Sequence, residues 1–203
     1  MYDESGRACC NIYRMTIDRN DGMYLSIYCD DIYYTDSLAT SFNPLDIGKD
    51  TGIFKGDDVE GMVLSGKFND ILYVASKRNG LVEVDFKNLC CRSLYRLAKD
   101  VRPTNLILDS NKNLWLSTTN GLVCYDLYSG ESVTYHSDPR DRFSVSDSYI
   151  TKVFKDDKSR LWVGTQYGGL NYYSPSHDVF RKFCKLSDGT SLEGAIVRSI
   201  VED

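Results

Sequence analysis

Short apolar runs separated by polar turns recur along the whole chain. Within the runs, apolar residues stand at nearly consecutive positions, as in Leu114, Trp115 and Leu116, which is typical of strands in sheets packed on both faces. No long stretch keeps the i, i+3, i+4, i+7 apolar spacing of an amphipathic helix. The pattern therefore predicts strands joined by tight turns, with little helix.

The apolar runs belong to a repeat. The segment that begins Asn113-Leu-Trp-Leu-Ser-Thr aligns with the one that begins Arg160-Leu-Trp-Val-Gly-Thr, given one extra residue before the glycine of the second segment. A third copy begins at Ile71, and a weaker fourth copy begins at Gly22. The aromatic anchors of the four copies are Tyr24, Tyr73, Trp115 and Trp162, which are 49, 42 and 47 residues apart. This period is typical of propeller blades.

Each unit reads as four short strands, which we call A to D in chain order. The expected A strands are 12–17, 62–64, 106–108 and 150–154. Strand B carries the aromatic anchor, strand C opens at Gly80, Gly121 and Gly169, and strand D covers 90–94, 132–135 and 180–183. Acidic turns such as 109–113 and 156–160 join strands A and B, and their Asp and Asn side chains are suited to capping their own backbone.

The fold class that follows is all-β: a β-propeller fragment of about four four-stranded blades, with partial blades at both ends. The expected division of the single propeller region 1–203 is 1–11 as the end of a blade, 12–58, 59–100, 101–147 and 148–194 as blades, and 195–203 as the start of a blade. Residues 36–58 are the least patterned and are expected to form a long excursion. Open terminal sheets would expose apolar faces, so we expect association with further blades or with a second copy, unless the chain closes as a small ring.

The segment Ile150–Tyr172 closely resembles the two-component regulator propeller repeat: an apolar strand, an acidic turn, Leu-Trp-Ile-Gly-Thr, Gly-Gly-Leu and an aromatic tail. Asn113–Asp126 is a second good copy, whereas Lys112 and Ser159 stand where the repeat usually has Gly. Proteins of this family are typically extracytoplasmic sensor regions of bacterial hybrid histidine kinases, and several respond to carbohydrate fragments. The resemblance implies a periplasmic sensor segment, with the remaining blades of a receptor as its partner, although the chain carries no kinase or receiver segment.

Composition and charge exclude several classes of function. The 24 basic and 29 acidic residues give a net charge of −5, and no basic cluster offsets it, which argues against nucleic acid as a partner. No run of about 18 apolar residues occurs, so this segment is not expected to insert into a membrane, and no signal-peptide pattern follows Met1. Only 6 of the acidic residues are Glu, and the excess of Asp favours turns over helices.

Candidate catalytic and metal-binding motifs are scarce. The seven cysteines contain no C-x-x-C pair, and His136 and His177 have no companion at metal-ligand spacing, so neither a metal nor another cofactor is expected. The acidic turn resembles the Asp-box of sialidase propellers, but Ser110 and Lys112 break that pattern. The aromatic anchors are best explained as core packing, with Trp115 and Trp162 in equivalent, largely buried positions. We therefore expect no enzyme, and an Asp-box glycosidase is the least favoured alternative.

The B–C and D–A connections of a propeller emerge on one face, and here they carry polar side chains. The candidate ligand-binding residues are Arg78, Asn79, Asn120, Gln166 and Tyr167 from B–C, and Arg140 and Arg142 from D–A. Amides, guanidinium groups and an exposed tyrosine suit a polyhydroxylated or anionic ligand. This predicts a non-enzymatic sensor for an oligosaccharide. Two other interpretations stay open: a scaffold for protein–protein interaction, including a homodimer, and loop residues that are merely solvated.

Overall fold

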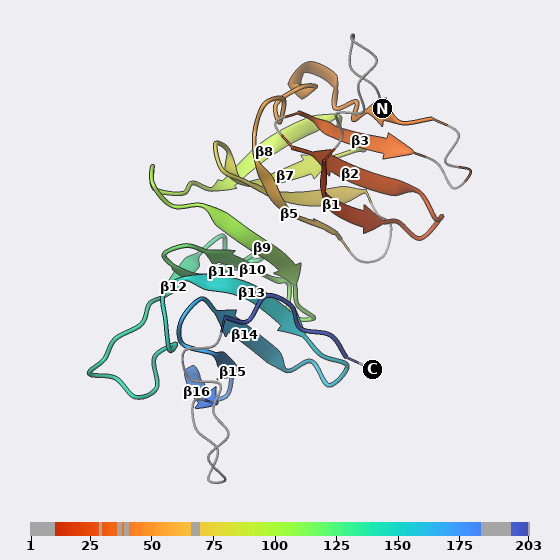
Figure 1. Ribbon diagram of the computed structural model, residues 1–203. Helices are drawn as coiled ribbons and strands as arrows, with labels where there is room; N and C mark the ends of the chain where they lie inside the picture. Colours follow the sequence, from red (N-terminus) through yellow and green to blue (C-terminus); the bar gives the residue numbers. More distant parts are fainter. Residues whose placement is uncertain are drawn as a thin grey trace. The chain divides into compact units, whose positions relative to one another are not determined.

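The computed structural model describes residues 11–28, 30–35, 38, 41–65, 70–183 and 196–202. These residues contain sixteen strands, arranged in four antiparallel four-stranded sheets, and one short 3₁₀ helix (Figure 1). Each sheet is a propeller blade whose strands follow one another in chain order, as the sequence predicts. Within the described ranges, the structure contains no helix with the length and hydropathy of a membrane span. The chain divides into two compact units, residues 1–97 and 98–203, which we call the N-terminal and C-terminal units.

The N-terminal unit holds blades 1 and 2. Blade 1 consists of β1 (Ile12–Ile17), β2 (Met23–Ile27), β3 (Ile32–Thr35) and β4 (Asn43–Pro44), and the 3₁₀ helix η1 (Gly48–Asp50) follows it. Blade 2 consists of β5 (Val59–Leu64), β6 (Ile71–Ser76), β7 (Gly80–Asp85) and β8 (Cys90–Tyr95).

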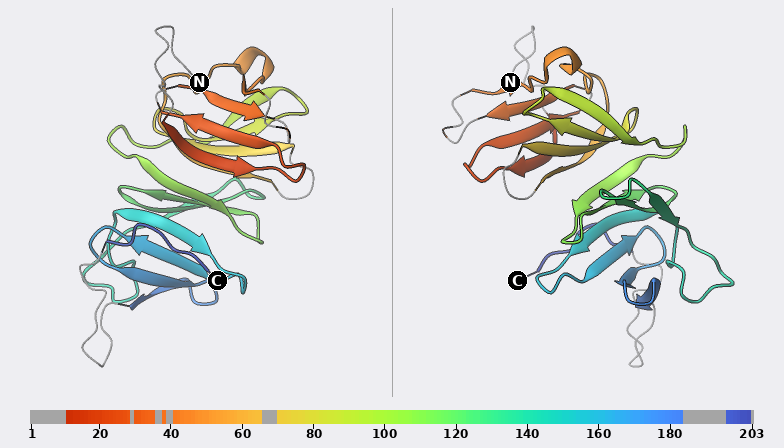
Figure 2. Two further views of the ribbon diagram at one scale, coloured as in Figure 1. Left: turned by 45° about the vertical axis from the view of Figure 1, so that its right-hand side comes forward. Right: turned by 180° about the vertical axis from the view of Figure 1, so that it is seen from behind.

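The C-terminal unit holds blades 3 and 4, seen from two other sides in Figure 2. Blade 3 consists of β9 (Pro103–Leu108), β10 (Asn113–Thr118), β11 (Gly121–Asp126) and β12 (Ser132–Tyr135). Blade 4 consists of β13 (Ile150–Lys155), β14 (Leu161–Thr165), β15 (Leu170–Ser174) and β16 (Val179–Phe183).

One backbone hydrogen bond recurs in all four blades. The residue that follows strand B donates its N–H to the carbonyl of the residue that precedes strand A. The four pairs are Tyr28 to Asn11, Lys77 to Asp58, Thr119 to Arg102 and Gln166 to Tyr149, at 2.9–3.0 Å. The bond therefore places each B–C turn against the D–A connection that leads into the same blade.

Buried apolar side chains fill the space between the two blades of each unit. In the N-terminal unit, Tyr24 and Ile32 of blade 1 pack with Leu72 and Val84 of blade 2. Phe54 joins this core at 1% exposure, so part of the expected excursion over 36–58 returns to the core. In the C-terminal unit, Trp115 and Leu122 of blade 3 pack with blade-4 residues that include Val153, Tyr173 and Phe180.

The two tryptophans are equivalent in register but differ in burial. Both indole Nε1 atoms donate to the first aspartate of the acidic turn, Trp115 to Asp109 and Trp162 to Asp156, each at 2.9 Å. Trp115 is 3% exposed, as predicted, because Tyr173 of the following blade packs against it at a ring distance of 4.9 Å. For Trp162 the expectation of a largely buried position is wrong: its side chain is only partly buried, because its ring neighbours among the described residues, Tyr172 and Phe183, belong to its own blade.

The segment 196–202 runs beside blade 4 without forming a strand. The N–H of Val197 donates to the carbonyl of Thr165, and its own carbonyl accepts a hydrogen bond from Thr151 Oγ1. Thr104 Oγ1 donates to Ile150 in the same way, so 196–202 contacts β13 much as β13 contacts β9. Residues 1–10 lie outside the described residues, and the expected blade boundaries stay predictions.

The acidic turns are capped by their own side chains, as expected. Asp109 Oδ1 accepts the N–H groups of Asn111 and Asn113, at 2.8 and 2.9 Å. Lys112 and Ser159, where the propeller repeat usually has Gly, have left-handed φ angles of 67° and 60°. A residue with a Cβ is strained in that region by about 1–2 kcal/mol.

Lys112→Gly is therefore expected to stabilise the protein by about 0.5–1 kcal/mol, because the relief of strain exceeds the larger unfolded-state entropy of glycine. The free energy of unfolding from urea titration measures the effect. Lys158→Gly is the matched control, since Lys158 lies in the next acidic turn without a positive φ. It should destabilise by about 0.5–1 kcal/mol, and a loss of stability in Lys112→Gly as well would contradict the strain argument.

Candidate functional site

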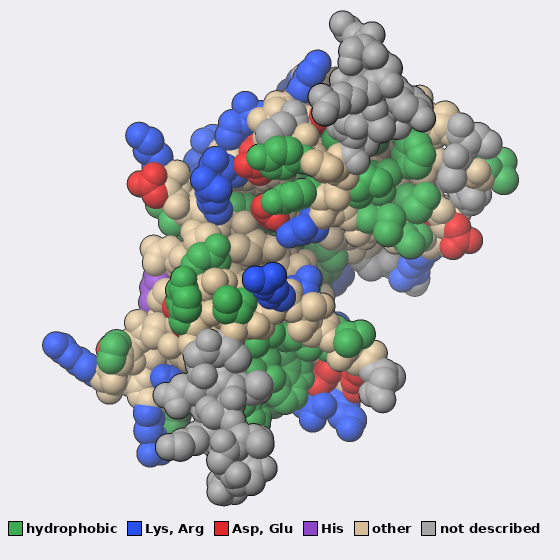
Figure 3. All heavy atoms as spheres, in the orientation of Figure 1, with side chains coloured by type: hydrophobic (Ala, Val, Ile, Leu, Met, Phe, Trp, Pro, Cys, Tyr) green, Lys and Arg blue, Asp and Glu red, His purple; other side chains and the backbone are tan. Residues whose placement is uncertain are grey.

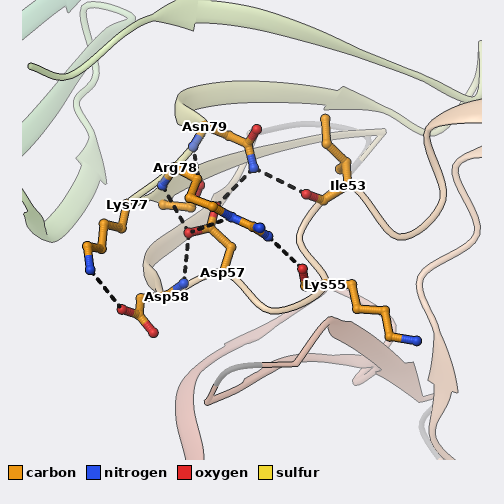
Figure 4. Close-up of polar contacts among 8 residues, drawn as sticks. Ile53, Lys55, Asp57, Asp58, Lys77, Arg78 and Asn79 are labelled. Atoms are coloured by element: carbon orange, nitrogen blue, oxygen red, sulfur yellow. Dashed lines mark hydrogen bonds and ion pairs between the residues drawn. The ribbon is translucent and has the colours of Figure 1, made fainter. Parts of the chain in front are cut away.

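In the N-terminal unit, the B–C turn between β6 and β7 is tied to the segment before β5 (Figure 4). Asp57, which is 2% exposed, is the centre of these contacts. Its Oδ1 accepts the N–H groups of Asp58 and Arg78, at 2.8 and 2.9 Å, and its Oδ2 accepts Asn79 Nδ2 at 2.9 Å. Asn79 Nδ2 also donates to the carbonyl of Ile53 at 3.2 Å.

The side chain of Arg78 belongs to the same network. Its Nη2 donates to the carbonyl of Lys55 at 2.6 Å, and its Nε lies 3.8 Å from Asp57 Oδ1. The guanidinium group remains accessible, because the side chain is 57% exposed. Of the two predicted ligand-binding residues in this turn, Asn79 is thus engaged in holding the fold, and Arg78 offers only its exposed part to a ligand.

In the C-terminal unit, three predicted site residues come together along the segment 147–149. Gly121, next to Asn120, donates its N–H to the carbonyl of Ser148 at 2.6 Å. Gln166 donates its N–H to the carbonyl of Tyr149, and Tyr167 donates its N–H to Asp147 Oδ2, both at 2.9 Å. We call the residues Asn120, Asp147, Tyr149, Gln166 and Tyr167 the tyrosine strip.

The backbone of the tyrosine strip is held firmly, while its aromatic side chains face water. Tyr167 is 66% exposed and Tyr149 is 38% exposed. Thr165 Oγ1 donates to the carbonyl of Gly169 at 2.9 Å and accepts the N–H of Gly168 at 3.0 Å, which fixes the turn that carries Tyr167. A Cβ at Gly168 would collide with Ser146, so the turn lies closely against the neighbouring connection. Exposed aromatic groups on a hydrogen-bonded backbone are suited to binding a ligand, because less backbone entropy is lost on binding.

Arg140 and Arg142 lie elsewhere in the C-terminal unit. The N–H of Arg140 donates to Asp138 Oδ1 at 2.9 Å. The guanidinium of Arg142 lies 4.4 Å from the centre of the Phe143 ring. The carbonyl of Phe143 accepts the N–H of Phe180 in β16, the outermost strand of blade 4. The two arginines therefore belong to the outer edge of the blade and are separate from the tyrosine strip.

Tyr149 and Asp147 are not among the ligand-binding residues that the sequence predicts. The signal that locates Tyr149 is its position immediately before strand A, because the recurring hydrogen bond places that position beside the residue after strand B. Asp147 is placed by its carboxylate, which accepts the N–H groups of both Tyr149 and Tyr167.

The carboxylates of Asp109 and Asp156 accept hydrogen bonds from their own acidic turns and from the tryptophan that follows each turn. Burial acts to raise the pKa of Asp156, but hydrogen bonds from Trp162 Nε1 and from Arg160 outweigh it and lower that pKa to about 2. Asp156 is thus a fixed anion, without the raised pKa of a general acid. No group of three or more His, Cys, Asp or Glu side chains suited to a metal ion occurs among the described residues.

No family model and no curated protein matches the sequence. Among solved structures, the chain is similar to the extracellular domain of the one-component system BT4673 from B. thetaiotaomicron, with 21% identity and a TM-score of 0.71, over 96% of this chain and 24% of that one. The extracellular domain of the hybrid two-component system BT3049 from the same organism matches with 18% identity and a TM-score of 0.69, over 95% of this chain and 24% of that one.

A third similar structure is virginiamycin B lyase from Staphylococcus aureus, with 13% identity and a TM-score of 0.62, over 93% of this chain and 64% of that one. The chain spans about a quarter of the length of the two extracellular domains. Four consecutive antiparallel blades and these similarities together show that the chain has the β-propeller fold found in the extracellular domains of bacterial signalling systems.

Proposed function

We propose that the chain is a non-enzymatic, ligand-sensing propeller segment of an extracytoplasmic two-component receptor, and that its tyrosine strip recognises a saccharide. The observation that carries the proposal is the pair of exposed rings, Tyr149 and Tyr167, held on a hydrogen-bonded backbone beside Gln166 and Asn120. The fold shared with extracellular domains of signalling systems supports the sensing role. A periplasmic location belongs to the same proposal.

The chemistry of the strip suits a polyhydroxylated ligand. Tyrosine rings offer an apolar face for the C–H groups of a sugar and a hydroxyl that donates or accepts hydrogen bonds. The amides of Asn120 and Gln166 each provide two donors and one acceptor oxygen for sugar hydroxyls. Asp147 accepts two backbone N–H groups and acts by positioning the two tyrosines.

Tyr167→Ala is expected to weaken saccharide binding by about tenfold or more while leaving the melting temperature nearly unchanged, because an exposed loop residue contributes little to the core. A glycan array identifies the binding saccharide, and calorimetry of both proteins with it measures the loss. Tyr128→Ala is the matched control. Tyr128 is 82% exposed and follows β11, so it lies at the opposite end of the blade-3 strands from Asn120 of the tyrosine strip. Equal losses of affinity in both variants, or a large fall in melting temperature for Tyr167→Ala, would contradict the proposal.

A second candidate function, a surface for protein association, is favoured by the exposed face of β1. Ile12, Met15 and Ile17 are 57%, 57% and 55% exposed, and hydrophobic side chains gather over this sheet in Figure 3. Exposed apolar patches of this kind mark interaction sites, here for a further blade or a second copy of the chain. Concentration-dependent self-association that Met15→Glu abolishes and Tyr167→Ala leaves intact would favour this function.

A further inference from the structure

A cavity of about 240 Å³ lies between blades 3 and 4 of the C-terminal unit, beside their acidic turns. The residues that matter for its chemistry are Asp109, Asn113, Trp115, Cys124, Lys155 and Tyr173. The acidic turns join the end of strand A to the start of strand B, whereas the tyrosine strip follows the end of strand B. The cavity and the tyrosine strip therefore lie at opposite ends of the strands in blades 3 and 4.

The inner wall of the cavity is apolar and fixed in place. The rings of Trp115 and Tyr173 meet edge to face at 4.9 Å. The hydroxyl groups of Tyr173 and Tyr135 both donate to Asp178 Oδ1, at 2.8 and 2.7 Å, so the Tyr173 ring is anchored across the two blades. Burial, together with the nearby Asp109, raises the pKa of the Cys124 thiol to about 12, so this part of the wall is neutral. The wall is formed before any ligand arrives.

The charged residues Asp109 and Lys155, which both line the cavity, differ in the number of their hydrogen-bond and ion-pair partners. Asp109 accepts four hydrogen bonds: from the N–H groups of Asn111 and Asn113, from Asn113 Nδ2 and from Trp115 Nε1, at 2.8–3.0 Å. These donors offset its charge and occupy its lone pairs. The ammonium group of Lys155 has no hydrogen-bond or ion-pair partner in the part of the chain that the structure describes. The cavity lining therefore includes one lysine without an ion-pair partner among the described residues, together with the polar residues Asn113 and Ser159.

We infer that this cavity is a second ligand site, and that it binds a single sugar ring carrying a carboxylate. Pockets for drug-sized ligands measure about 300–1,000 Å³, so a cavity of about 240 Å³ suits one ring better than a chain of rings. Lys155 pairs with the carboxylate, and Asn113 and Ser159 bind hydroxyl groups. The inference does not depend on the saccharide that the tyrosine strip recognises.

The probes that test it are D-galacturonate and D-glucuronate, with methyl β-D-glucopyranoside as the neutral comparison, in calorimetric titrations of the whole chain. Saturable one-to-one binding of at least one uronate is expected, and the neutral glycoside should bind about tenfold or more weakly. Lys155→Gln should weaken uronate binding by about the same factor, since a hydrogen bond to a charged group is lost. Lys158→Gln is the matched control and should change nothing, because Lys158 is exposed and outside the cavity lining.

A second measurement follows the cavity directly. The chain has two tryptophans, so Trp162→Phe leaves Trp115 as the only indole, and its fluorescence should change with the same dissociation constant as the calorimetry gives. No saturable uronate binding, or uronate binding that survives Lys155→Gln unchanged, would overturn the inference. Uronate binding that Tyr167→Ala abolishes and Lys155→Gln leaves intact would place the acidic sugar on the tyrosine strip, which refutes the cavity site and supports the proposed function.

Discussion

Replacing Trp115 with alanine should lower the free energy of unfolding by about 3–5 kcal/mol, the range for a core aromatic. The indole is 3% exposed and packs against Tyr173 and Tyr135, so its removal leaves a cavity in the middle of the C-terminal unit. The substitution also leaves Asp109 Oδ2 without its indole donor. Urea unfolding followed by circular dichroism measures the loss.

Trp162→Ala is the matched control, because Trp162 has the same strand position and the same hydrogen bond to the acidic turn. Its ring neighbours among the described residues lie in its own blade, and the side chain is only partly buried. We therefore expect a smaller loss, about 1–3 kcal/mol. Equal losses for the two variants would show that packing between blades contributes little at Trp115.

Asp57→Ala should destabilise the N-terminal unit by about 2–4 kcal/mol. The carboxylate is 2% exposed and accepts the N–H groups of Asp58 and Arg78 and the amide of Asn79. Alanine would leave these three donors without their acceptor in a partly buried place, and the turn between β6 and β7 would lose its attachment. Hydrogen exchange at the Arg78 amide, together with the free energy of unfolding, reports the effect.

Two further variants separate the parts of the Asp57 network. Asp57→Asn keeps an acceptor oxygen for the two backbone N–H groups and should cost about 1 kcal/mol. Arg78→Ala keeps the backbone N–H and removes only a half-exposed guanidinium, so a loss below about 1 kcal/mol is expected. A larger loss in Arg78→Ala than in Asp57→Ala would mean that the guanidinium, and not the buried carboxylate, holds the turn.

The strands themselves follow from local pattern. The expected ranges 12–17 and 132–135 coincide with β1 and β12, because the apolar runs end at polar turns on both sides. The glycines expected to open strand C, Gly80, Gly121 and Gly169, have positive φ angles of 70°, 112° and 71°, which glycine adopts without strain. The starts of β5 and β9 differ from the expected ranges 62–64 and 106–108. The strands begin three residues earlier, at Val59 and Pro103, because polar or small residues near their starts interrupt the apolar pattern.

The candidate site could be predicted only in part. Gln166 and Tyr167 are identifiable as B–C turn residues from the repeat alone, but Asp147 and Tyr149, which position them, come from a connection about twenty residues away. Arg142 looks as suitable for a ligand as Gln166 in the sequence. The hydrogen bond between Phe143 and Phe180 nevertheless holds its loop at the outer strand.

Contacts within a few residues set the β-strands, the capped acidic turns with Asp109 and Asp156, and the order of strands within each blade, so these features can be predicted from the sequence. Contacts with distant segments set three other features: Asp57 binds Asn79, Trp115 is more buried than Trp162, and Lys155 lines a cavity between two blades. The physical reason is that burial and hydrogen-bond partners of a side chain are set by whichever segment packs against it, and a repeat assigns equivalent positions without equivalent neighbours.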